Sequence, residues 1–233
     1  MFARTLFLAV WSLLNAFSAL ADEAPVVAPA EAPIATVLGE SIGRDVLVEA
    51  STQQYREKLS PEEFNDWQRK SSDKLLVMAI RTPLIQAYAD RNGLEPTDAE
   101  LQPTIDRMKK TNQRLKEKRP DLATDFESPA FLKLQRDFVR ASLRDFKVGE
   151  ALWKQCGGSV GFGSLGSCMA FEGQQAFFQE EAKAGHLIFH DPDIEKQFWR
   201  AIMDKRQLAD VVQDDPKKIA DFFDSVRHRQ NDD

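Results

Sequence analysis

Hydrophobic residues recur at three- and four-residue steps over most of the chain, and this spacing predicts a mainly helical protein. The clearest helix begins at Ser60-Pro61-Glu62-Glu63, a capping box with proline at the first helical position. We expect Pro83 to bend or break this helix and Gly93 to end it. Its apolar positions are Phe64, Trp67, Leu75, Met78, Ile80, Leu84, Ile85 and Tyr88.

Two further helices follow, each with a recognisable start. Thr97-Asp98-Ala99-Glu100 is a second capping box, although Pro103 lies close behind it. Ser128-Pro129 begins another helix, which we expect to end near Trp153. The first helix has a stripe of Leu101, Ile105, Met108 and Leu115, and the second has Phe131, Leu134, Phe138, Leu143 and Phe146 on one side.

The last third of the chain differs in composition and in the elements it predicts. Residues 156–168 are small and glycine-rich, which indicates a flexible loop. Helices are expected over residues 170–184, after Asp191-Pro192 and after Asp215-Pro216, with a brief strand at 187–189 and a frayed polar tail at 227–233.

A small strand element precedes the helices. Residues 34–38 and 41–42 suit short strands, and Gly39-Glu40 suits the turn between them. Residues 44–57 could form a short helix. The predicted fold class is therefore mainly α, with a short β-hairpin at its start and additional C-terminal helices.

The N-terminus is typical of an exported protein. Residues 1–21 combine Arg4, an apolar stretch and Ala19-Leu20-Ala21, which together indicate a cleaved signal peptide. The alternative is an uncleaved inner-membrane anchor, although the stretch is shorter than a spanning helix requires. Residues 22–33 are rich in Ala and Pro and read as an extended tether. We therefore expect a periplasmic protein.

Composition excludes several classes of function. The chain has 233 residues, a formal net charge of −6 and 29% charged residues, which disfavours a nucleic-acid-binding surface along the whole chain. Three histidines and two cysteines leave little material for a metal site, and His186, His190 and His228 read as surface or packing residues. No G-x-S-x-G elbow is present, and we predict neither a catalytic residue nor a metal.

Residues 161–166 match G-x-G-x-x-G, but a predicted helix precedes them where a dinucleotide-binding site needs a strand. No cofactor is therefore predicted. Cys156 and Cys168, the only cysteines, suggest a structural disulfide in an exported protein. Two unpaired thiols and a redox pair are the alternatives.

Residues 107–119 hold seven basic residues and one acid, in contrast to the acidic whole. A solvated helix face explains such a run. The alternative is an attractive surface for acidic lipid headgroups or acidic client segments.

The order of these elements resembles a known family. Four segments are similar to the N-terminal domain of SurA-like and other parvulin-associated periplasmic chaperones. They are the strand–turn–strand at 34–42, with Leu38 where Asn is common, the apolar helix through residues 75–87, Ala89-Asp90-Arg91-Asn92-Gly93-Leu94 and Thr97-Asp98-Ala99-Glu100-Leu101. The resemblance covers residues 34–155. Residues 156–233 are expected to form a Gly-rich loop and helices, which either complete that domain or are appended to it. This segment is too helical for a parvulin domain.

The resemblance implies a holdase that binds unfolded exported or outer-membrane polypeptides in an apolar helical groove without a cofactor. Trp67, Met78, Met108 and Phe138 are the candidate client-binding residues, although a buried core role is the more common one for each. Two alternatives remain open: a peptidyl-prolyl cis-trans isomerase, and a non-catalytic interaction subunit of an envelope assembly.

Overall fold

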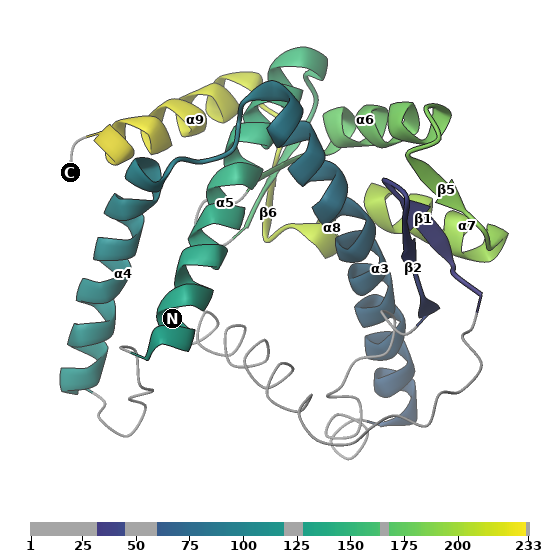
Figure 1. The fold of residues 1–233 in the computed structure, drawn as a ribbon, viewed down its shortest axis with the longest axis horizontal. Helices are drawn as coiled ribbons and strands as arrows, with labels where there is room; N and C mark the ends of the chain where they lie inside the picture. Colours follow the sequence, from purple (N-terminus) through teal and green to yellow (C-terminus); the bar gives the residue numbers. More distant parts are fainter. Residues whose placement is uncertain (1–31, 45–59, 119–127, 164–167, 232–233) are drawn as a thin grey trace. The chain divides into compact units, whose positions relative to one another are not determined.

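The computed structural model describes residues 32–44, 60–118, 128–163 and 168–231 and is mainly helical, with two small antiparallel sheets (Figure 1). The predicted signal peptide, most of the tether and the short helix proposed for 44–57 lie outside the described residues. None of the described helices combines the length and hydropathy that a membrane span requires.

The chain forms two compact units, and each draws on segments that are distant in sequence. The first unit consists of residues up to 82 together with 181–207, and the second consists of 83–180 together with 208–233. The boundary between them falls after Glu180 in α6 (Phe171–Lys183), after Gln207 in α8 (Lys205–Leu208), and at Pro83 in α3 (Pro61–Asn92). This helix continues through Pro83 without a break.

Both predicted ends of α3 are confirmed. The Ser60 amide donates to Glu63 Oε2 at 2.9 Å, and the Glu63 amide donates to Ser60 Oγ at 3.4 Å, which is the expected capping box. At the other end Gly93 has a φ of +64°, and the Leu94 amide donates to the Ala89 carbonyl at 2.9 Å. This is the helix stop that glycine permits, because only glycine adopts that conformation without strain.

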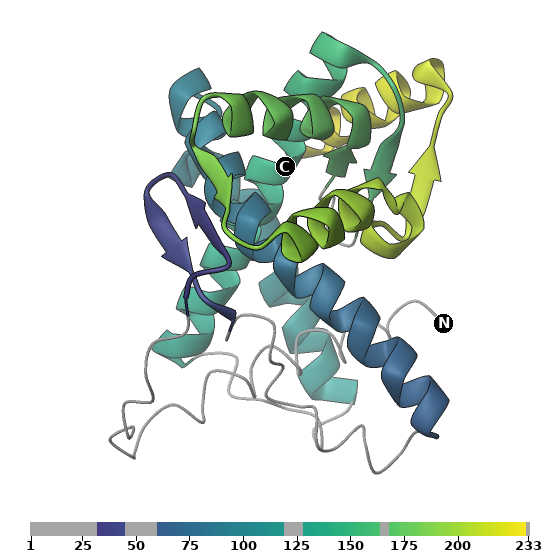
Figure 2. The same ribbon diagram turned by 90° about the vertical axis from the view of Figure 1, so that its right-hand side faces the viewer.

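The first unit contains a sheet of three strands in the order β2-β1-β5 (Figure 2). The predicted hairpin is present as β1 (Ala35–Val37) and β2 (Glu40–Ile42), although its turn is Leu38-Gly39 and not the predicted Gly39-Glu40. The predicted strand at 187–189 is β5 (Leu187–Phe189). β5 pairs antiparallel with β1, so residues far along the chain complete the sheet that the hairpin begins. Buried and less buried side chains alternate along β1, which shows that one face of the sheet covers a core.

The turn between β1 and β2 has an unusual residue. Leu38 and Gly39 have φ values of +53° and +86°, the pattern of a two-residue turn that Asn-Gly ordinarily occupies. Leu38 is 39% exposed, and its amide donates to the His186 carbonyl at 2.7 Å. A leucine in this conformation carries roughly 1 kcal/mol of backbone strain.

Replacing Leu38 with asparagine should raise the free energy of unfolding by about 1 kcal/mol, because asparagine tolerates positive φ. Urea denaturation measures the change. Leu38→Ala is the control, because alanine removes the exposed leucine side chain but still has a β-carbon and lacks the side-chain amide of asparagine. Equal stabilities for the asparagine and alanine variants would contradict an origin in backbone strain.

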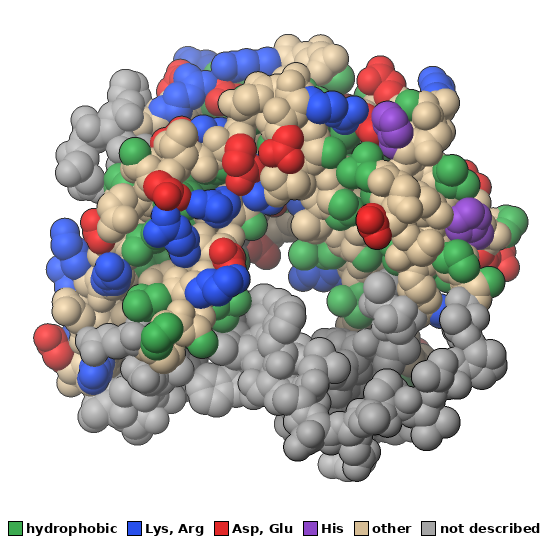
Figure 3. Space-filling model, in the orientation of Figure 1, with side chains coloured by type: hydrophobic (Ala, Val, Ile, Leu, Met, Phe, Trp, Pro, Cys, Tyr) green, Lys and Arg blue, Asp and Glu red, His purple; other side chains and the backbone are tan. Residues whose placement is uncertain are grey.

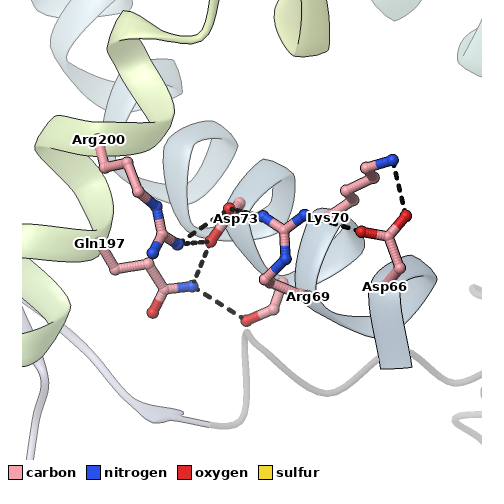
Figure 4. Close-up of polar contacts among 7 residues, drawn as sticks. Asp66, Arg69, Lys70, Asp73, Gln197 and Arg200 are labelled. Carbon is pink, nitrogen blue, oxygen red and sulfur yellow. Dashed lines mark hydrogen bonds and ion pairs between the residues drawn. The ribbon is translucent and has the colours of Figure 1, made fainter. Parts of the chain in front are cut away.

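A buried carboxylate joins α3 to α7 (Pro192–Met203) within the first unit (Figure 4). Asp73 is 1% exposed and accepts hydrogen bonds from Arg200 at 2.9 and 3.1 Å and from Gln197 at 2.8 Å. Arg69 lies 3.7 Å away on the same helix, and Gln197 also donates to Ser72. A charge removed from water needs such partners, so these contacts fix how α7 lies against α3.

Arg200→Ala should lower the free energy of unfolding by about 2 kcal/mol, because it leaves the buried Asp73 carboxylate without its main cation. Asp73→Asn should cost less, since the Arg200 side chain is 59% exposed and can be solvated. The double variant should be more stable than Arg200→Ala alone. A double-mutant cycle measured in urea tests this, and purely additive losses would show that the two groups are not coupled.

The second unit contains α4 (Asp98–Lys118), α5 (Pro129–Cys156), α6 (Phe171–Lys183) and α9 (Pro216–Asn231), with α8 (Lys205–Leu208) at the boundary. Its sheet has the order β4-β3-β6, from β3 (Val160–Phe162), β4 (Cys168–Ala170) and β6 (Val211–Gln213). Phe146 of α5 packs against Phe222 and Phe223 of α9, with ring centroids 6.4 and 5.4 Å apart.

The flexible loop predicted for residues 156–168 is wrong in part, because β3 and the first residue of β4 lie within it. Gly161 explains the error. A β-carbon at this position would lie 2.8 Å from the Phe171 ring, so the glycine allows close packing within a strand.

Candidate functional site

The α4–α5 hairpin has the most distinctive surface in the second unit. The two helices lie side by side (Figure 1), and a buried cluster of Leu101, Ile105, Val139 and Leu143 joins them. Met108 packs against this cluster. We call residues 107–118 of α4 and 129–138 of α5 the distal end of the hairpin, because they lie beyond this cluster toward the connecting residues 119–127.

Local sequence fixes where both helices begin. The Thr97 amide donates to Glu100 Oε2 at 2.7 Å and the Glu100 amide donates to Thr97 Oγ1 at 3.4 Å, which confirms the second capping box. Ser128 caps α5 by accepting from the Phe131 amide at 3.3 Å. α4 contains Pro103 in its first turns without interruption.

Ion pairs hold the hairpin together on the side of the buried cluster. Arg144 donates to both oxygens of Glu95, at 2.7 and 2.9 Å, and Asp98 contacts Arg136 and Arg140 at 2.6 and 2.8 Å. The hydrogen bonds from Arg144 lower the pKa of Glu95, and those from Arg136 lower the pKa of Asp98. These carboxylates therefore stabilise the hairpin only while they are ionised.

The cations of α5 and of the distal part of α4 differ sharply. Every Lys and Arg of α5 forms an ion pair. The pairs are Lys133 with Asp137, Arg136 and Arg140 with Asp98, Arg144 with Glu95, Lys147 with Glu100, and Lys154 with Glu150. On α4, exposed cations have no ion pair with any residue that the structure describes. These are Lys109, Lys110, Arg114, Lys116 and Lys118.

The distal end also has apolar side chains that the protein leaves in contact with solvent. Leu132 is 38% exposed and Leu134 is 36% exposed, while Phe131 and Phe138 are half-buried. Phe131, Leu134 and Phe138 recur at three- and four-residue steps and form one stripe on α5. Figure 3 shows hydrophobic side chains near the start of α5, with Lys and Arg side chains beside them over α4.

This stripe partly corrects the prediction from sequence. Phe131, Leu134, Phe138, Leu143 and Phe146 were expected to share one side of the helix. Leu143 and Phe146 are 8% and 3% exposed, so only the later part of that side is core. In the distal part, Phe131 and Phe138 are half-buried and Leu134 is exposed.

A buried polar group lies next to the stripe. Gln135, one turn from both Phe131 and Phe138, is 4% exposed, and its Nε2 has no hydrogen-bond partner among the described residues. Leaving such a donor unsatisfied costs roughly 1–3 kcal/mol. The distal end therefore holds a buried, unsatisfied donor beside the stripe.

The four candidate client-binding residues are divided between the two units. Trp67 and Met78 lie on α3 in the first unit, where Trp67 is half-buried beside Phe64, with ring centroids 5.7 Å apart, and Met78 is 51% exposed. Met108 and Phe138 lie on the hairpin of the second unit. Met108 packs against the buried cluster and Phe138 is half-buried, and sequence reasoning did not single out Leu132 and Leu134 as exposed side chains of the same hairpin.

The predicted disulfide between Cys156 and Cys168 is absent. The Cys168 thiol is buried against Gly149 and donates to the Phe146 carbonyl at 3.5 Å. Cys156 lies ten residues further along α5 than Phe146, a rise of about 15 Å, whereas the α-carbons of a disulfide lie within about 7 Å of each other. The spacing in sequence could not reveal that β4 returns along the helix toward its middle.

The histidines make ordinary polar contacts where their side chains are described. His186 Nδ1 lies 2.9 Å from Glu181 Oε2, and His190 Nε2 lies 2.8 Å from Thr36 Oγ1. No cluster of three or more His, Cys, Asp or Glu side chains suited to a metal ion occurs in the described ranges. The side chain of His228 lies outside them.

Comparison with known proteins adds nothing to this geometry: no family model, curated protein or solved structure matches the chain.

Arg144→Ala should lower the free energy of unfolding by about 1.5 kcal/mol at pH 7, because it removes a two-point, charge-assisted bond to Glu95. The pKa of Glu95 is lowered in the folded state, so this contribution is present above the unfolded-state pKa of about 4.3 and is lost as the pH falls below it. The gap between wild type and variant should therefore narrow from pH 5 to pH 3 in urea denaturation. If the free energies of unfolding of wild type and Arg144→Ala changed with pH in parallel, the ionised Glu95 would not be the source of the lost stability.

Proposed function

We propose that the protein is a periplasmic chaperone-like holdase of the SurA-like type, which binds unfolded exported or outer-membrane polypeptides at the distal end of the α4–α5 hairpin. The observation that carries the proposal is the apolar stripe of Phe131, Leu134 and Phe138, with Leu132, left exposed or half-buried on an otherwise well-packed hairpin. Apolar surface of this kind is typical of sites that receive a partner.

The fold supports the family resemblance in its order of elements. A strand–turn–strand precedes a long helix with a glycine stop, and a helix hairpin follows. Residues beyond 156 add β5 to the N-terminal hairpin and add β6 and α9 to the second unit. These residues extend the helical framework, in agreement with a chaperone domain completed by its C-terminal part.

The mechanism requires no nucleotide. A client segment gains about 25 cal/mol for each Å² of apolar surface it buries against the stripe, and the ordering of a flexible chain offsets most of that gain. Binding of this kind is weak, fast and tolerant of sequence, which are the properties that a holdase needs.

The variant Phe131→Ser/Leu134→Ser should lose most of the ability to suppress aggregation of an unfolded outer-membrane protein, because it makes the α5 stripe polar. Light scattering during dilution of the client from urea measures the effect. The matched control is Ile188→Ser/Val211→Ser, which removes two apolar side chains that are 45% and 58% exposed elsewhere. This control should behave as wild type.

Two outcomes would overturn the proposal. If the wild-type protein at molar excess leaves aggregation unchanged, it is not a holdase. If both double variants lose activity equally while retaining wild-type circular dichroism, client binding does not depend on the distal end.

A further inference from the structure

The unpaired cations of α4 are the feature that the proposed function does not use. Five exposed Lys and Arg side chains fall within residues 109–118, and Glu117 is the one acid among them. The chain as a whole has a net charge of −6, and the neighbouring helix matches each of its own cations with a carboxylate. A soluble helix in this protein therefore does not need an excess of positive charge like that of residues 109–118.

These cations repel one another in the free protein, because charges on successive turns of a helix lie about 6 Å apart. Lys110, Arg114 and Lys118 follow one another at four-residue steps on α4. A ligand with negative charge relieves that repulsion and gains attraction at the same time. The surface is thus complementary to an acidic partner.

The same end of the hairpin presents the apolar stripe of α5. The stripe from Phe131 to Phe138 is about 10 Å long, and Lys109 to Lys118 spans about 14 Å of α4, at 1.5 Å for each residue. An extended polypeptide advances about 3.3 Å for each residue, so three to five residues span either surface. A short segment can therefore place apolar and acidic side chains on both.

We propose that the distal end selects extended client segments in which apolar side chains alternate with, or are flanked by, Asp or Glu within about five residues. This inference rests on the proposed function and names its preferred substrate class. The α5 stripe receives the apolar side chains, and the unpaired cations of α4 receive the carboxylates.

An anionic lipid surface fits the geometry less well. A helix that lies in a membrane interface inserts its own apolar face while its cations contact the headgroups. The apolar face of α4 is occupied, because Leu101 and Ile105 are buried in the hairpin and Met108 packs against the same cluster. The cations and the exposed apolar side chains lie on different helices, an arrangement that suits a strand laid across both.

The test compares two fluorescent peptides with the same apolar residues. The acidic peptide contains Asp and Glu, and the neutral peptide has Asn and Gln at the same positions. Fluorescence anisotropy with the wild-type protein should give about tenfold tighter binding of the acidic peptide at 50 mM salt, and this preference should shrink toward 500 mM salt. Lys109→Gln/Lys110→Gln/Arg114→Gln should remove the preference but keep the binding of the neutral peptide.

The matched control is Lys183→Gln/Lys217→Gln/Lys218→Gln, which changes the net charge equally by removing three exposed lysines outside the distal end. It should retain the preference. If both peptides bind wild type equally, the selection of acidic segments is overturned while the holdase proposal stands. If neither peptide binds, the proposed function fails as well.

Vesicles of phosphatidylglycerol provide the last comparison. If they bind the wild-type protein and not the α4 triple variant, while the peptides show no charge preference, the cations serve a lipid surface and the inference is wrong. If the control triple variant also loses the peptide preference, the effect belongs to the net charge of the chain and not to α4.

Discussion

Burial of four aliphatic side chains between α4 and α5 is the interaction on which the candidate site depends. Leu101 and Ile105 on one helix, with Val139 and Leu143 on the other, hold the helices together at one end of the hairpin. The ion pairs of Glu95, Asp98 and Glu100 accompany this cluster, and one of them reaches into the distal end, where Asp98 contacts Arg136. The residues beyond Met108 are therefore positioned by the cluster, and many of their side chains are exposed.

This arrangement separates stability from binding. On the proximal side each cation has a carboxylate, and the apolar residues are covered, so the contacts there are satisfied within the chain. On the distal side, Lys109, Lys110, Arg114, Lys116 and Lys118 of α4 have no ion pair with a described residue, and Leu132 and Leu134 of α5 are exposed. A surface for transient partners needs that condition, since a group already satisfied by the protein has little to gain from a ligand.

Features set by neighbouring residues could be predicted from the sequence. The capping boxes at Ser60 and Thr97, the stop at Gly93 and the hairpin at 35–42 depend on residues within a few positions of one another. The sheet of β3, β4 and β6 could not be predicted, because Val160 pairs with Gln213 across fifty residues. The buried Asp73 was missed for the same reason, since its principal partner, Arg200, lies 127 residues away.

The candidate site illustrates a different limit of sequence reasoning. The periodicity of Phe131, Leu134 and Phe138 shows that one side of α5 is apolar, but the same pattern describes a covered face and an uncovered one. Exposure depends on how far the neighbouring elements extend: α9 packs on Phe146 in the later part of the helix, whereas Leu132 and Leu134 near its start are exposed. Similarly, composition shows that residues 107–119 are basic. Only the structure shows that each Lys and Arg of α5 has a carboxylate partner, while most of those of α4 have none among the described residues. The functional reading of the hairpin thus comes from the contrast between two adjacent helices, a property that neither segment has alone.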